Sequence, residues 1–159
     1  MVLKWLNEDH YEPEDRTHLN PNSSYLAVVK VSENQAFNVL FPKDPLDKVI
    51  IIQVASMDGE YKKAYRALPA LDQNRFYFDL KISLLQLGVI FSLEKGVRTL
   101  ESVQVNKVIY FDGLTKDRFF DAVFTVTHAI EVARTKLGQF RDSILPSQAG
   151  QYDDWKGTI

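Results

Sequence analysis

The stretch KVIIIQVASM, Lys48–Met57, decides the fold, because it is the most apolar run of the chain. Its β-branched residues are consecutive rather than spaced three and four apart, which is typical of a strand with apolar side chains on both faces. We therefore predict a central strand here. We expect helices to cover one face of its sheet, and the other face to be covered by a partner or to stay partly exposed.

Four further strands are predicted around this run. YLAVVKV (25–31) and AFNVLFP (36–42) flank the short polar turn ENQ and should form an antiparallel hairpin. The other two are VIFSLEKG (89–96) and VQVNKVIYF (103–111), in which apolar and polar residues alternate. Strands that are joined by short connections favour antiparallel pairing, so we predict one antiparallel sheet of five strands.

Helices are predicted wherever apolar residues recur at spacings of three and four. They cover VLKWLNEDH near the N-terminus before Pro13, a minor helix after the N-cap Asp58, a longer one after Asp72 that ends at Gly88, and a long one after Thr115. In the helix after Asp72, one apolar stripe is predicted to be widened by a second set of apolar residues. The stripe is Phe76, Leu80, Leu84 and Leu87, and the second set is Phe78, Ile82 and Leu85.

The predicted order is therefore helix, three strands, a minor helix, a helix, two strands and a helix, which indicates a two-layer α+β domain with helices on one face. We assign residues 1–141 to this single domain. Residues 142–159 are predicted to be a C-terminal tail, flexible in part or docked through Ile144, Leu145, Tyr152 and Trp155.

Composition excludes several classes of function. A formal charge of −2 disfavours nucleic acid and anionic membrane surfaces as partners. The absence of cysteine excludes disulfides, thiolate catalysis and the common zinc ribbons. No apolar run reaches the roughly 18 residues of a membrane span or has a signal-peptide pattern, so we expect a cytoplasmic protein.

Two segments carry a family resemblance. RFYFDLKISLLQLGVIF (75–91) and IYFDGLTKDRFFDAV (109–123) resemble motif regions of an uncharacterised, mainly archaeal family, domain of unknown function 2299. The similarity extends over most of residues 1–141. It implies the fold of type III secretion chaperones, a twisted antiparallel sheet with helices on one side that often pairs into dimers. It implies no catalytic residue and no cofactor.

The stretch NEDHYEPEDRTHLN (7–20) combines His10 and His18 with five carboxylates. The histidines are not at the four-residue helical spacing that places two metal ligands on one face, and Pro13 between them interrupts a helix. We interpret the stretch as a solvated connection, with a metal site as the alternative. His128, with no second histidine within one helical turn, is interpreted as a helix-face histidine.

The strongest polar cluster is the corner where the strand ending near 111 meets the long helix. It comprises Lys107, Tyr110, Asp112, Asp117 and Arg118. A helix N-terminus offers free N–H groups to an anion, so the corner could bind a small ligand, a peptide end, or a divalent cation through Asp112. Capping and ion pairing between strand and helix is the alternative, and Asp117 opposes an anion there.

Two functions follow from these patterns. The favoured one is a protein-binding or chaperone-like assembly module that acts as a homodimer and presents sheet or helix surface to a client. The alternative is a small-ligand protein or enzyme that uses the corner from Lys107 to Arg118. Phosphate-binding loops and nucleophile elbows are absent from the sequence, and Lys62, Lys63 and Arg66 are interpreted as a solvated basic face.

Overall fold

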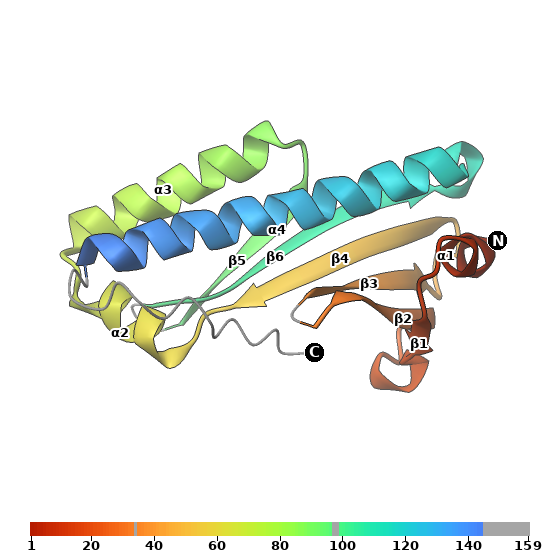
Figure 1. The fold of residues 1–159 in the computed structure, drawn as a ribbon, viewed down its shortest axis with the longest axis horizontal. Coiled ribbons are helices and arrows are strands. Elements are labelled where there is room, and N and C mark those ends of the chain that lie inside the picture. The colour runs from red at the N-terminus through yellow and green to blue at the C-terminus, as the bar shows by residue number, and fades with distance from the viewer. Residues whose placement is uncertain (34, 97–98, 145–159) are drawn as a thin grey trace. The chain divides into compact units, whose positions relative to one another are not determined.

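The computed structural model describes residues 1–33, 35–96 and 99–144, which adopt an α+β architecture (Figure 1). Six strands form one antiparallel sheet in the order β1-β2-β3-β4-β6-β5. The helices and strands in chain order are α1 (Val2–Glu8), β1 (Pro13–Asp15), η1 (Thr17–Leu19), β2 (Ser23–Ser32), β3 (Gln35–Pro42), β4 (Lys48–Ser56), α2 (Gly59–Ala67), α3 (Ala70–Gln86), β5 (Ile90–Gly96), β6 (Thr99–Tyr110), η2 (Phe111–Gly113) and α4 (Lys116–Ile144).

The sheet has one strand more than the five predicted, because β1 forms within the stretch interpreted as a solvated connection. It pairs antiparallel with β2, with Pro13 opposite Val29 and Asp15 opposite Ala27. Three residues are too few to show an apolar alternation. Proline and acidic residues are tolerated at a sheet edge because the outer N–H groups need no partner strand, so composition gave no signal here.

The apolar run at the centre of the sequence forms β4, between β3 and β6, as predicted. Its side chains alternate. One set is fully or almost fully buried, and the intervening Ile50 and Ile52 are only half-buried, while Val54 is 40% exposed. The buried set is Val49, Ile51, Gln53 and Ala55. The reverse face of this strand is therefore partly exposed in the described chain, and its cover by a partner stays a prediction.

The chain divides into two compact units. Unit 1 contains residues 1–53 and 106–127, and unit 2 contains residues 54–105 and α4 from His128 onward. The strands β4 and β6 and the helix α4 each continue from one unit into the other. That residues 1–141 fold as a single cooperative domain stays a prediction. The predicted tail falls partly within α4, which extends to Ile144, and residues 145–159 lie outside the described part of the chain.

In unit 1, aromatic rings connect α1 with the beginning of α4, and they connect Tyr11, in the segment after α1, with the sheet. Trp5 lies 6.2 Å from Phe119 between ring centroids, and Tyr11 lies 6.1 Å from Phe37 in an edge-on arrangement. Phe37 and Phe119 are completely buried. Since Phe37 shares its face of β3 with the buried Val39, Tyr11, whose ring also stacks on Phe120 of α4, lies over the buried face of the sheet.

In unit 2, α3 and the C-terminal half of α4 run side by side (Figure 1). The rings of Phe76 and Phe140 approach to 4.3 Å between centroids, and Lys136 Nζ lies 2.5 Å from Asp79 Oδ2. The Asp58 carboxylate caps α2 as predicted, accepting hydrogen bonds from the N–H groups of Glu60 and Tyr61 at 2.9 Å. The capping role predicted for Asp72 was wrong, because α3 begins at Ala70 and Asp72 lies in its first turn.

Candidate functional site

The helix α3 is apolar on two opposite sides. Phe76, Leu80 and Leu84 are buried within unit 2. Leu71, Phe78, Ile82 and Leu85 are exposed to 62%, 59%, 53% and 61%. Together with the exposed Arg75, these four residues follow a spacing of four, three, four and three, which places them along one line of a helix. We call this row, Leu71, Arg75, Phe78, Ile82 and Leu85, the α3 stripe.

The α3 stripe corrects the prediction that Phe78, Ile82 and Leu85 widen the buried stripe. Successive helix residues are rotated by about 100°, so residues at positions such as 78 and 80 lie on opposite sides of the helix. The helix ends as predicted, since Gly88 has a φ of 63° and its N–H donates to the Leu85 carbonyl oxygen at 3.1 Å. After this turn, Ile90 at the start of β5 is another exposed apolar residue, at 57%.

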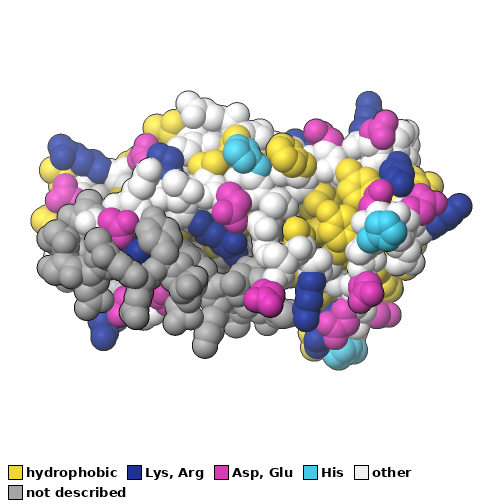
Figure 2. Space-filling model, viewed as in Figure 1, with side chains coloured by type: hydrophobic (Ala, Val, Ile, Leu, Met, Phe, Trp, Pro, Cys, Tyr) yellow, Lys and Arg dark blue, Asp and Glu magenta, His cyan; other side chains and the backbone are white. Residues whose placement is uncertain are grey.

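The α3 stripe contains one charged residue, Arg75, and the charged residues Asp72 and Asp79 lie next to it on α3. Arg75 Nη1 lies 3.8 Å from Asp72 Oδ1, and both side chains are largely exposed, at 74% and 46%. Asp79 is also exposed while it binds Lys136. Exposed pairs such as Arg75–Asp72 contribute little to stability, so Arg75 can exchange its partner at small cost. Acidic and basic side chains are interspersed over the visible face of the molecule (Figure 2).

The residues of the predicted corner do not all lie on the same face of the sheet. Lys107 and Tyr110 are three positions apart in β6, so their side chains point to opposite faces of the sheet. Tyr110 is 55% exposed, and Lys48 Nζ lies 5.7 Å from its ring centroid. Lys107 is half-buried on the other face.

The remaining corner residues lie around the start of α4. Asp112 lies in η2, and Asp117 lies in the first turn of α4. The guanidinium of Arg118 donates from Nη1 to the Gly113 carbonyl oxygen at 3.1 Å, and its backbone N–H donates to Thr115 Oγ1 at 3.2 Å, which confirms the predicted cap. These contacts fix how η2 meets α4, as the capping interpretation expects.

Two acidic residues at the end of α1 bind the first residue of α4. Lys116 Nζ lies 3.0 Å from Glu8 Oε2 and 3.2 Å from Asp9 Oδ2. The hydrogen bond with Glu8 raises the pKa of Lys116, with a smaller contribution from Asp9. This part of the acidic stretch therefore joins two helices of unit 1.

The second half of the acidic stretch is attached to β2 by hydrogen bonds. Asp15 Oδ1 accepts from the hydroxyl of Thr17 at 2.6 Å and from its N–H at 2.8 Å, and these bonds lower the pKa of Asp15. Thr17 Oγ1 in turn accepts from the N–H of Leu26 at 3.0 Å. Among the described residues, no group of three or more His, Asp or Glu side chains is placed to hold a metal ion.

The three histidines occupy separate, exposed positions. His10 terminates α1 with a φ of 64°, where its N–H donates to the Asn7 carbonyl oxygen at 3.2 Å. The next N–H, of Tyr11, donates to the Leu6 carbonyl oxygen at 2.9 Å. This pair of bonds is the Schellman C-terminal motif, so the backbone of His10 has a structural role. His18 is exposed in η1, and His128 is exposed on α4.

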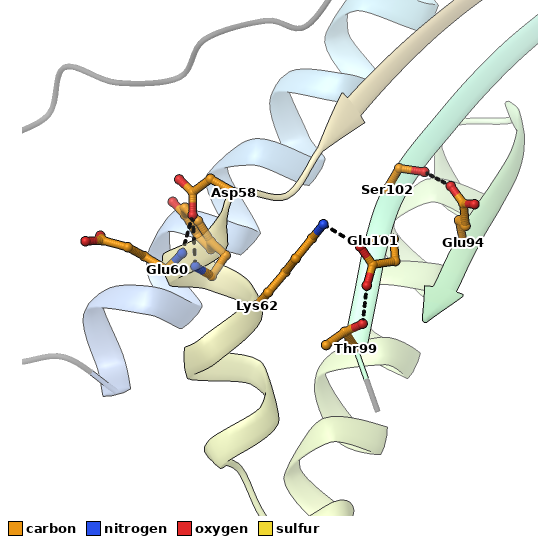
Figure 3. A network of polar contacts seen from close by, with 8 residues as sticks. Asp58, Glu60, Lys62, Glu94, Thr99, Glu101 and Ser102 are labelled. Carbon is orange, nitrogen blue, oxygen red and sulfur yellow. Dashed lines mark hydrogen bonds and ion pairs between the residues drawn. The ribbon is translucent and has the colours of Figure 1, made fainter. Parts of the chain in front are cut away.

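Sequence reasoning missed a polar network in unit 2, centred on Glu101 of β6 (Figure 3). The Glu101 carboxylate binds Lys62 of α2 and accepts a hydrogen bond from the buried Thr99 hydroxyl. On the neighbouring strand β5, Glu94 Oε2 accepts a hydrogen bond from Ser102 at 2.8 Å. The hydrogen bonds from Lys62 and then Thr99 lower the pKa of Glu101, as does the charge of Arg66. The predicted basic face is thus partly neutralised.

This network predicts that the free energy of unfolding depends on pH. A carboxylate with a lowered pKa in the folded state binds protons more weakly than in the unfolded chain, where its pKa is near 4.3. Glu101 therefore stabilises the protein above about pH 4.3, and that contribution is lost as the pH falls through the lower, folded-state value. Urea denaturation between about pH 6 and pH 3 should show a shallower loss of stability in Glu101→Gln than in the wild type. The exposed Glu60→Gln serves as control, and equal slopes in Glu101→Gln and wild type would contradict the assignment.

Comparison with known proteins places the chain in a family. The family described as "Uncharacterized conserved protein (DUF2299)" matches residues 1–137. A search of curated proteins finds no match. Within the described residues, no helix is long and apolar enough to cross a membrane.

Two solved structures are similar to this one. An uncharacterised protein from Methanothermobacter thermautotrophicus is 25% identical, with a TM-score of 0.80 over 91% of this chain and 96% of that chain. YbjN from E. coli is more distant, at 11% identity and a TM-score of 0.43 over 93% of this chain and 89% of that chain. The family match covers all the strands and most of α4, and the chain therefore belongs to the family of uncharacterised conserved proteins DUF2299.

Proposed function

We propose that this chain is a protein-binding assembly module that acts as a homodimer. The observation that carries the proposal is the α3 stripe, whose four apolar side chains are each more than half exposed. Burying an apolar side chain of this size stabilises an assembly by roughly 1.5–3 kcal/mol, so four such exposed side chains along one helix favour association. A contiguous apolar surface with a charged border is typical of protein interaction sites.

The reverse face of the sheet in unit 1 is a second surface that suits protein binding. Leu26 and Leu40 on β2 and β3 are opposite each other, and Leu40 is opposite Ile50 of β4. All three side chains, with Ile52 beside them, are half-buried. The chaperone-like part of the proposal is that this face holds an apolar segment of a client protein, as the resemblance to secretion chaperones implies.

The alternative function, a small-ligand site or an enzyme at the corner from Lys107 to Arg118, has weaker support. The opposite directions of Lys107 and Tyr110 separate two of its five groups. The bond from Arg118 to the Gly113 carbonyl oxygen already occupies one guanidinium nitrogen.

The mass of the purified protein tests the homodimer. Light scattering and sedimentation over a wide range of concentration should give twice the chain mass of 18.3 kDa at the upper end. Dilution should return the mass toward 18.3 kDa, because a stripe from a single helix is a small interface. A mass of one chain at every concentration would remove the proposal.

A further inference from the structure

We infer that the occupant of the α3 stripe is the α3 stripe of a second copy of this chain, lying antiparallel to the first. The inference rests on the proposed function and deepens it, because it names the partner, the surface and the direction of pairing. The stripe has the spacing with which one helix packs its side chains between those of another helix. It is also the longest row of exposed large apolar side chains on a single helix of the described chain.

The position of Arg75 decides the direction of pairing. A parallel, in-register pair would place Arg75 against Arg75 of the second copy in the middle of an apolar seam. Two like charges in such a seam repel each other and lose solvation, which disfavours this arrangement. Antiparallel pairing separates the two arginines.

The charges around the stripe also select a register. When Leu71 lies opposite Ile82 of the second copy, helix geometry places Arg75 opposite Phe78 of that copy. A guanidinium stacks favourably on an aromatic ring. In the same register Asp79 of the second copy follows directly beside Phe78, within reach of Arg75. Because the pair has two-fold symmetry, each such contact forms twice.

The charge pattern therefore favours a second copy over an unrelated protein. Each α3 carries both Arg75 and Asp79, and both lie on the same side of the stripe. A two-fold axis places this side of one helix next to the same side of the other helix, so Arg75 of each copy lies near Asp79 of the other. Among the described residues, the ion pair that Arg75 would give up is the long, exposed contact to Asp72. Asp79 can retain Lys136 while its second oxygen accepts from Arg75.

Disulfide trapping tests the direction and register. The chain has no cysteine of its own, so introduced cysteines report without background. Leu71→Cys with Ile82→Cys should give an interchain disulfide under mild oxidation, because residues in opposite positions of packed helices approach within the range that a disulfide spans. Within one chain these positions are roughly 16 Å apart along the helix, so no intrachain bond can form.

The single cysteine variants complete the trapping experiment. Each should remain uncross-linked, since antiparallel pairing keeps Leu71 away from Leu71 and Ile82 away from Ile82. A disulfide in Ile82→Cys alone would indicate parallel pairing and overturn the inference. The absence of a disulfide in the double variant, in a protein whose mass is that of a dimer, would also overturn it.

Substitution of the stripe provides an independent readout. Phe78→Glu should shift the mass to one chain at concentrations where the wild type is a dimer. Phe124→Glu is the matched control, since Phe124 lies on α4 in unit 1 and is 71% exposed, and it should leave the dimer unchanged. A dimeric Phe78→Glu protein would overturn the inference and leave the proposed homodimer standing. A monomeric wild type would instead remove the proposed function itself.

Discussion

Leu80→Ala is expected to lower the free energy of unfolding by about 2–5 kcal/mol, while Leu71→Ala lowers that of the monomer by less than about 0.5 kcal/mol. Both substitutions remove the same atoms from the same helix. Leu80 is completely buried, so alanine leaves a cavity in unit 2. Leu71 is 62% exposed, so its side chain loses little contact. Leucine and alanine have similar helix propensities, so the difference reports burial alone.

Urea denaturation of dilute protein measures this difference. Measurements at higher protein concentration then distinguish the buried face of α3 from the exposed face by a second criterion. A dimer that binds only folded chains adds stability by mass action, so the wild type should become more stable at higher concentration. Leu71→Ala should gain less from concentration than the wild type, whereas Leu80→Ala should gain as much. Equal losses for both substitutions in dilute protein would mean that α3 does not have one buried and one exposed apolar side.

The strands could be predicted from the sequence because their signal is local. In β4, consecutive β-branched residues fit no exposed helix, and in β3 the alternation of Phe37, Val39 and Phe41 gives both the element and its face. β1 gave no such signal because Pro13–Asp15 has no apolar alternation. Its strand conformation depends on the edge of β2, which is a tertiary contact.

The faces of α3 could not be assigned from periodicity. The row through Phe76, Leu80 and Leu84 and the row through Phe78, Ile82 and Leu85 have the same three-and-four spacing. Either row could face the protein interior. Which row does so is set by the contact of Phe76 with Phe140, and such a contact between distant parts of the chain is not encoded in the local pattern.

The candidate corner shows the converse case, in which the sequence held a signal that the prediction did not use. Lys107 and Tyr110 differ by an odd number of positions in one strand, and strand geometry alone assigns them to opposite faces. The Glu101 network had no local signal, because Lys62 lies in α2 and Glu101 lies in β6. The corner from Lys107 to Arg118 was predicted because its residues are close in sequence. The residues of the Glu101 network are distant in sequence and come together only in the folded chain.

Phe37→Ala is expected to lower the free energy of unfolding by about 3–5 kcal/mol, because the ring is completely buried on β3 and packs edge-on against Tyr11. Phe41→Ala is the matched control on the same face of the same strand. Phe41 is only half-buried, so its substitution should cost clearly less. Far-UV circular dichroism during urea denaturation measures both.

The Leu80→Ala substitution also tests whether the two units unfold together. Phe37 lies in unit 1 and Leu80 lies in unit 2, while β4, β6 and α4 continue through both. Breaking either unit would interrupt these three elements, so we expect one cooperative transition. In a Trp155→Phe background, Trp5 fluorescence reports on unit 1 alone, since Trp5 lies against Phe119. Leu80→Ala should then shift the fluorescence midpoint of Trp5 as far as it shifts the circular dichroism midpoint. If Trp5 unfolds at its wild-type midpoint in that variant, the units are separate folding units, and residues 1–141 are not a single domain.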